Sequence, residues 1–86
     1  MTDVDRVIQE IADLLPKTTC CRHSGKHDAD DDGLWYFENP ETENSVQIES
    51  STGMCPFLVE HDLTSERFIA QTISEVVDKI VEWLTL

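Results

Sequence analysis

Residues 34–60, LWYFENPETENSVQIESSTGMCPFLVE, decide the fold because apolar side chains recur there at every second position. Each short run of this kind is typical of a β-strand with one buried face. The runs lie at residues 34–38, 45–50 and 57–60. Because the links between them are short, the sequence predicts that they form a three-stranded antiparallel meander.

Turn-forming residues connect these strands. Residues 39–44, NPETEN, predict a hairpin loop, and residues 50–56 predict the next reversal around Gly53. Beyond them, residues 67–71 form one more short run that offers an optional strand at the edge of the sheet. The meander is therefore expected to have three or four strands.

The alternation also assigns side chains to the two faces of the sheet, because neighbouring residues of a strand point to opposite sides. One face is apolar and is expected to be buried; it carries Trp35, Phe37, Val46, Ile48, Phe57 and Val59. The other face is expected to stay open; it carries Tyr36, Glu38, Gln47, Glu49, Leu58 and Glu60. An apolar spot ringed by carboxylates is typical of a binding surface. A plain solvated face is the alternative, since antiparallel sheets commonly have one.

Two further segments, residues 3–15 and 73–84, repeat apolar side chains at the spacing of three and four that gathers them on one stripe of a helix. Pro16 ends the first helix. Thr72, with Glu75 three residues later, predicts a capping box at the start of the second. Both helices are expected to cover the apolar face of the sheet.

The length of 86 residues allows one domain, so residues 1–86 are expected to form a single two-layer α+β sandwich. Its N-terminal and C-terminal helices lie on the same sheet face in this prediction. No apolar run approaches the roughly 18 residues of a membrane span, and the N-terminus lacks the pattern of a signal peptide. Three cysteines cannot all pair within one chain, which favours reduced thiols. We expect a cytoplasmic protein, either a monomer or a weak homodimer.

The net charge of -12 arises entirely after His27. Residues 28–66 hold eleven Asp or Glu and no Lys or Arg, whereas residues 1–27 are neutral. Direct binding to nucleic acid is disfavoured, because phosphate contacts need clustered Lys and Arg. A field of one sign instead favours solubility or the attraction of a positively charged partner.

Residues 17–33 are expected to form a loop, and they hold the densest chemistry of the chain. Its candidate ligands are Cys20, Cys21, His23, His27, Asp28, Asp30, Asp31 and Asp32. Asp28, Asp30 and Asp32 match the oxygen ligands in the first half of an EF-hand calcium loop. The second half does not match, because Asn39 stands at the twelfth position, where a bidentate Glu is expected.

A zinc site or a catalytic thiol would draw on the cysteines and histidines. Zinc would take Cys20 or Cys21 with the two histidines of the loop, and Cys55 or His61 offers a further ligand, but no C-x-x-C spacing is present. Cys55 lies at the entry to a strand, where a cysteine is usually a packing residue. His61 and Asp62 are expected to form a polar turn.

Three hypotheses follow from these features. The leading one is a non-enzymatic acidic module that binds a basic protein surface, as immunity proteins, inhibitors or nucleic-acid mimics do, with no cofactor. The alternative is a metal-responsive domain in which residues 20–32 become ordered on binding calcium or zinc. A third is a small thiol enzyme, which would need a cysteine with a lowered pKa.

Overall fold

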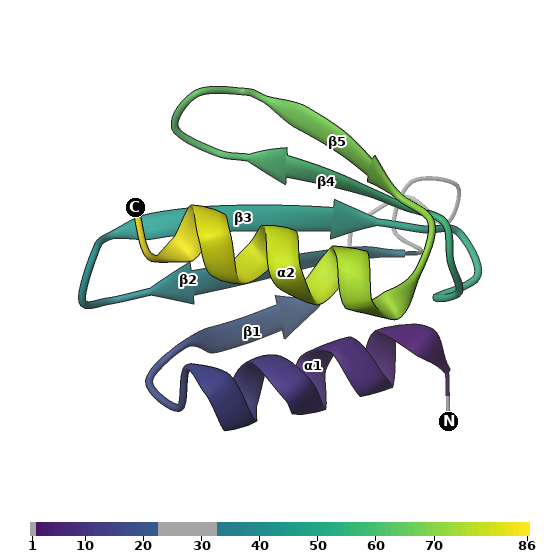
Figure 1. Cartoon of the computed structure of the whole chain (residues 1–86), viewed down its shortest axis with the longest axis horizontal. Helices are drawn as coiled ribbons and strands as arrows, with labels where there is room; N and C mark the ends of the chain where they lie inside the picture. Colours follow the sequence, from purple (N-terminus) through teal and green to yellow (C-terminus); the bar gives the residue numbers. More distant parts are fainter. Residues whose placement is uncertain (1, 23–32) are drawn as a thin grey trace.

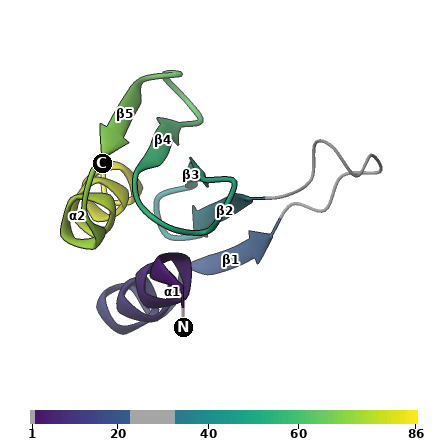
Figure 2. The ribbon, with the colours of Figure 1, turned by 90° about the vertical axis from the view of Figure 1, so that its right-hand side faces the viewer.

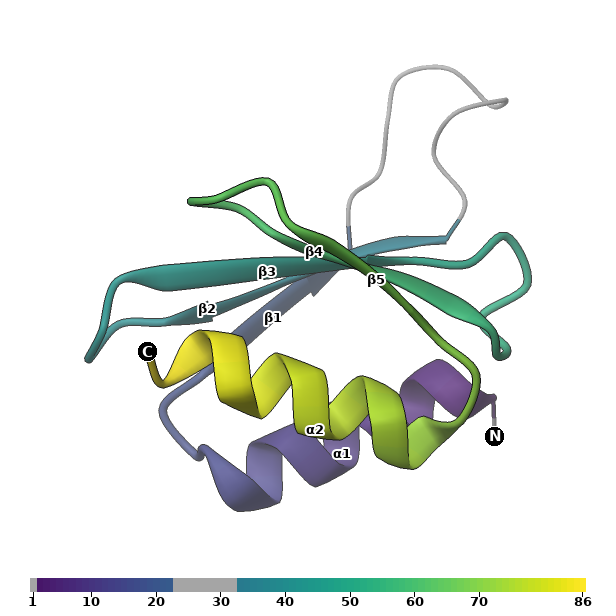
Figure 3. The ribbon, with the colours of Figure 1, turned by 45° about the horizontal axis from the view of Figure 1, so that its top comes forward.

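The chain forms a single antiparallel sheet with two helices on one of its faces (Figure 1). This computed structural model describes residues 2–22 and 33–86. The elements in chain order are α1 (Asp3–Leu14), β1 (Thr19–Arg22), β2 (Leu34–Asn39), β3 (Asn44–Glu49), β4 (Phe57–His61), β5 (Arg67–Ala70) and α2 (Ile73–Leu84). The strands lie in the sheet in the order of the sequence. Figures 2 and 3 show both helices on the same side of the sheet, and the two helices are in contact with each other.

The predicted two-layer α+β architecture is confirmed, with five strands in place of three or four. The optional edge strand is present as β5, whereas β1 occupies part of the segment predicted to be a loop, so that part of the prediction is wrong. β1 lacks the apolar alternation that marks the other strands; it is held by pairing with β2 and by Cys20, which packs against the core. Within the described residues, neither helix is long and apolar enough to cross a membrane.

The core lies between the sheet and the helices. The six side chains predicted to face inward are all buried. They pack with residues of α1, β5 and α2, namely Val4, Val7, Ile11, Ala70, Val76, Val77, Ile80, Trp83 and Leu84. Since successive side chains of a strand point to opposite faces, the residues between these inward positions have their side chains on the far side of the sheet.

Two hairpin loops share one geometry. In the β2–β3 loop the Glu43 N–H donates to the Asn39 carbonyl at 2.8 Å, and in the β4–β5 loop the Ser65 N–H donates to the His61 carbonyl at 2.8 Å. Glu43 and Ser65 have φ values of 62° and 61°, the left-handed conformation that favours glycine. Because neither residue is glycine, each of these left-handed conformations costs conformational free energy.

The β2–β3 loop also holds the C-terminal end of α2. Asn39 Nδ2 and Thr42 Oγ1 both donate to the Leu84 carbonyl, at 2.9 Å and 2.6 Å, and Asn44 Nδ2 donates to the Leu86 carbonyl at 3.2 Å. The last carbonyls of a helix have no partner within the helix, so Asn39 and Thr42 satisfy a Leu84 carbonyl that would otherwise be buried unpaired. The loop thereby fixes the position of α2 on the sheet.

The N-terminal ends of the two helices are capped differently. At α1, Thr2 and Asp5 form a complete capping box. At α2, Thr72 Oγ1 accepts a hydrogen bond from the Glu75 N–H at 3.1 Å, as predicted. The Glu75 carboxylate, however, accepts from the Gln71 N–H at 3.0 Å, so the predicted reciprocal bond to Thr72 is not formed.

Candidate functional site

The sheet face opposite the helices brings together the six residues that the sequence singles out as a partner face. These are Tyr36, Glu38, Gln47, Glu49, Leu58 and Glu60, from the three central strands β2, β3 and β4. In the described part of the chain, no helix covers this face, which we call the open face (Figure 3). The alternation in the sequence therefore assigned these side chains to the correct side of the sheet.

A polar row crosses the middle of the open face. Gln47 Nε2 donates to Glu60 Oε1 at 2.7 Å, and Arg67 Nε donates to Glu60 Oε2 at 3.2 Å. Both oxygens of the Glu60 carboxylate are engaged, and its side chain is only 19% exposed. The Glu60 carboxylate is thus paired with Arg67 and held in place, and Arg67, which the sequence did not single out, belongs to the same face. Alternation along β5 would have placed Arg67 on the open face.

The unpaired negative charge of the open face comes from Glu38 and Glu49. Both side chains are exposed, and neither makes a hydrogen bond or an ion pair with another described residue. Glu38 pairs with Ser45, four residues before Glu49 on β3, so the two Cα atoms are about 14 Å apart in regular strand geometry. The two carboxylates therefore mark opposite ends of the face.

Apolar side chains form a second row beside Glu49. The register pairs Leu34 with Glu49, Glu49 with Leu58, and Leu58 with Ile69, so these four residues lie on neighbouring strands. Leu34 and Leu58 are half-buried, and Ile69 is 60% exposed. Alternation along β2 and β5 puts Leu34 and Ile69 on the open face, but only the register between strands shows that they lie beside Glu49 and Leu58. The row joins exposed apolar surface to an unpaired carboxylate.

The cysteines point away from one another. Cys20 pairs with the inward-facing Phe37, whereas Cys21 pairs with Tyr36 of the open face, so adjacent thiols lie on opposite sides of β1. Burial raises the pKa of Cys20 to about 11. Burial also raises the pKa of Cys55, with a smaller contribution from its contact with Asp3. A thiol with a raised pKa is protonated at neutral pH, the opposite of an activated nucleophile.

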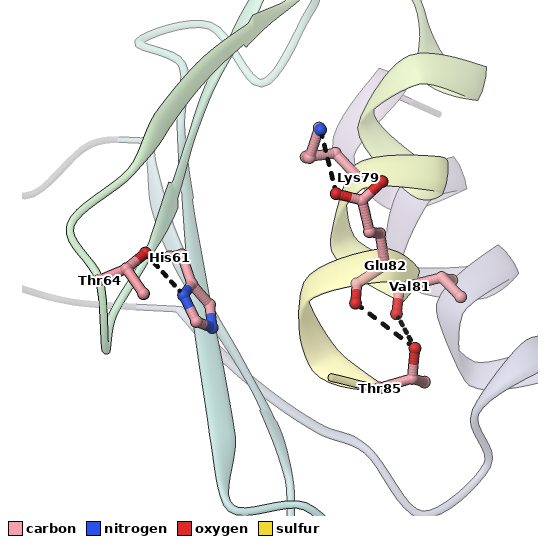
Figure 4. A network of polar contacts seen from close by, with 6 residues as sticks. All are labelled: His61, Thr64, Lys79, Val81, Glu82 and Thr85. Carbon is pink, nitrogen blue, oxygen red and sulfur yellow. Dashed lines mark hydrogen bonds and ion pairs between the residues drawn. The ribbon is translucent and has the colours of Figure 1, made fainter.

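His61 lies in the core and not in the polar turn that the sequence predicted; the turn begins at Asp62. Its Nδ1 is 2.9 Å from Thr64 Oγ1, and its ring centroid is 5.5 Å from that of Trp83 on α2. Figure 4 shows the imidazole pointing from β4 towards α2. Its Nε2 is buried and has no hydrogen-bond partner among the described residues. The prediction was wrong because period-two burial continues to the last residue of β4.

The predicted calcium ligands Asp28, Asp30 and Asp32 lie outside the described residues, as do His23 and His27. In residues 2–22 and 33–86, no three His, Cys, Asp or Glu side chains gather closely enough to hold a metal ion. The calcium and zinc hypotheses stay predictions that rest on the sequence.

Comparison of the chain with models of protein families, with curated proteins and with solved structures finds no match. The geometry defines the chain as a two-layer α+β domain whose sheet has one face packed on helices and one face open. Its function is therefore argued from the open face alone.

Proposed function

We propose that this chain is a non-enzymatic interaction module whose open face binds a basic protein surface, as immunity proteins, inhibitors and nucleic-acid mimics do. The observation that carries the proposal is the combination of a partly exposed apolar row with two carboxylates that no other described side chain pairs with, on a sheet face that no described helix covers. Apolar surface rimmed by charge is the usual anatomy of a protein interface. The net charge of -12 adds a field that attracts a basic partner from a distance.

The residues of the face have different roles in this proposal. Leu58 and Ile69 supply apolar area that becomes buried and contributes to affinity. Glu38 and Glu49 pair with Lys or Arg of the partner and act mainly on the association rate, because exposed ion pairs contribute only about 0–1 kcal/mol to stability. Glu60 keeps the middle of the face ordered through its bonds to neighbouring strands.

Carbodiimide coupling tests which carboxylates touch the partner. The immobilised chain is used to capture basic proteins from an extract of the cells that make it, and the purified complex is treated with a zero-length carbodiimide. This reagent joins a carboxylate to a lysine amine only where the two are in contact. The proposal predicts coupling through Glu38 and Glu49.

Glu10 and Asp13 serve as internal controls, since they are exposed carboxylates of α1, in the other layer of the sandwich. Peptide mapping by mass spectrometry compares the two pairs in a single experiment. Coupling concentrated at Glu10 and Asp13, with none at the open face, would contradict the proposed function.

A further inference from the structure

The edge of the sheet at β5 has the features of a strand-acceptor site. β5 is the last strand in the sheet order, and within residues 2–22 and 33–86 its only neighbouring strand is β4. An edge strand presents unpaired backbone N–H and C=O groups, which form a template for another extended chain. The register of β5 shows which of its groups these are.

The alternation of an antiparallel ladder assigns the free groups to Arg67 and Ile69. The His61 N–H donates to the Glu66 carbonyl at 2.9 Å, which makes the pair of His61 and Glu66 a hydrogen-bonded one. Hydrogen-bonded and non-hydrogen-bonded pairs alternate along an antiparallel pair of strands. Phe68 and Ala70 therefore bond to β4, while the N–H and C=O groups of Arg67 and Ile69 point away from the sheet.

The side chains of this edge also distinguish it from the edge at β1. Ile69 is 60% exposed and continues the apolar row of the open face through its partner Leu58. β1 carries no large exposed apolar side chain among its described side chains, of which Thr19 and Cys21 are exposed. The edge at β5 thus combines free backbone groups with apolar area.

Charge indicates what kind of chain would pair there. Lys79 of α2 lies 4.8 Å from the centroid of the half-buried Phe68 ring of β5, so this side of α2 faces the edge. Glu75 and Glu82, four residues before and three residues after Lys79, lie on the same side of the helix. Lys79 is already paired with Glu82 at 3.3 Å. On the helix side of the edge two carboxylates meet one cation, and on the open-face side Arg67 is paired with Glu60, so negative charge is in excess.

We propose that β5 accepts an extended segment of the basic partner as a sixth strand, with apolar residues on the open face beside Ile69 and Lys or Arg residues on the helix side beside Glu75 and Glu82. This mode of recognition uses main-chain hydrogen bonds for affinity and alternate side chains for specificity. The inference rests on the proposed function and adds the docking element to it. A second copy of this chain fits less well, because each copy carries a net charge of -12.

Amide hydrogen exchange tests the proposal with a defined probe, a capped synthetic peptide of four Lys-Val repeats. The full chain, labelled with ¹⁵N, is measured at low salt with and without the peptide. Phe68 and Ala70 amides are bonded to β4 and serve as references. We expect exchange at Arg67 and Ile69 to slow by tenfold or more when the peptide is bound, because their N–H groups gain partners.

Two variants separate backbone pairing from side-chain contact. Ile69→Pro removes an N–H that points outward and so removes no bond to β4, since proline is tolerated at such edge positions. Ile69→Thr keeps the N–H and is the matched control. The proposal predicts that Ile69→Pro abolishes both peptide binding and the protection of Arg67, while Ile69→Thr retains the protection.

The other outcomes would overturn the proposal in different ways. Shifts at Glu38 and Glu49 without protection at β5 would refute strand addition and leave the proposed function standing. The absence of any change at low salt would count against both. Protection of Arg67 and Ile69 without peptide, growing with protein concentration, would make a second copy the occupant and refute a basic partner there.

Discussion

Replacing Gly33 by alanine tests the register on which the open face depends. Gly33 lies just before β2, is buried, and has a φ of +88°. Its carbonyl accepts a hydrogen bond from the Ser50 N–H at 2.8 Å, which extends the β2–β3 pairing by one step beyond Leu34 and Glu49. A Cβ at this position would overlap the Ser50 backbone carbonyl, so either the backbone shifts or the pairing is lost.

The expected loss of stability has two parts. An alanine with positive φ costs about 1–2 kcal/mol. Displacing the backbone of Ser50 also disrupts the hydrogen bond from the Ser50 N–H to the Gly33 carbonyl, which has a net contribution of about 1 kcal/mol. We therefore expect Gly33→Ala to lower the free energy of unfolding by about 2–3 kcal/mol, a large share of the stability of a domain of this size.

Gly53→Ala is the matched control. Gly53 also has a positive φ, +75°, but its added Cβ would meet side chains and no backbone atom, with Val4 at 3.3 Å and Thr2 at 3.7 Å. The backbone part alone, about 1–2 kcal/mol, is expected there. Urea denaturation followed by circular dichroism gives both values by linear extrapolation. If Gly33→Ala destabilised the chain no more than Gly53→Ala does, the pairing of Gly33 with Ser50 would be refuted.

Three further predictions concern single sites. Asn39→Ala should lower the free energy of unfolding by about 1–3 kcal/mol, because the buried Leu84 carbonyl loses one of its donors; a urea titration showing no loss would contradict this. Ser65→Gly should raise the melting temperature, since glycine relieves a left-handed residue by about 0.5–1 kcal/mol; a lower melting temperature would refute that conformation. With a pKa of about 11, Cys20 should react with iodoacetamide at pH 8 at least about tenfold more slowly than the exposed Cys21, in variants that keep one cysteine each. Because the raised pKa favours the thiol, the Cys20 rate should climb with pH towards about 11, and equal rates at pH 8 would contradict its burial.

Hydrophobic periodicity predicted most of the fold. Alternation placed Trp35, Val46 and Phe57 in the core and assigned Glu38 and Glu49 to the opposite face, as the structure confirms. It failed at β1, where the run from Thr19 to Arg22 has no apolar alternation. That strand exists because β2 offers a partner, which is a tertiary effect and not a local one.

The sequence could not predict which residues of the open face are neighbours on adjacent strands. The bond from Arg67 to Glu60 and the apolar row that ends at Ile69 both depend on the register of β4 and β5. Parity fixes the face of a residue but not its neighbour on the next strand. His61 was expected to form a polar turn with Asp62, whereas in the fold it is buried and its ring lies 5.5 Å from that of Trp83 on α2, a contact between distant segments that the local sequence does not show.

The association rate with the captured basic partner tests the central claim most directly. The double variant Glu38→Lys with Glu49→Lys changes the open face, and Glu10→Lys with Asp13→Lys makes the same change of net charge on α1. Stopped-flow measurement at two salt concentrations compares both with the unmodified chain. Because steering charges act most strongly near the contact, we predict that the open-face variant associates about tenfold more slowly than the α1 variant at low salt, and that the difference shrinks at high salt. Equal rates for the two variants would contradict binding through the open face.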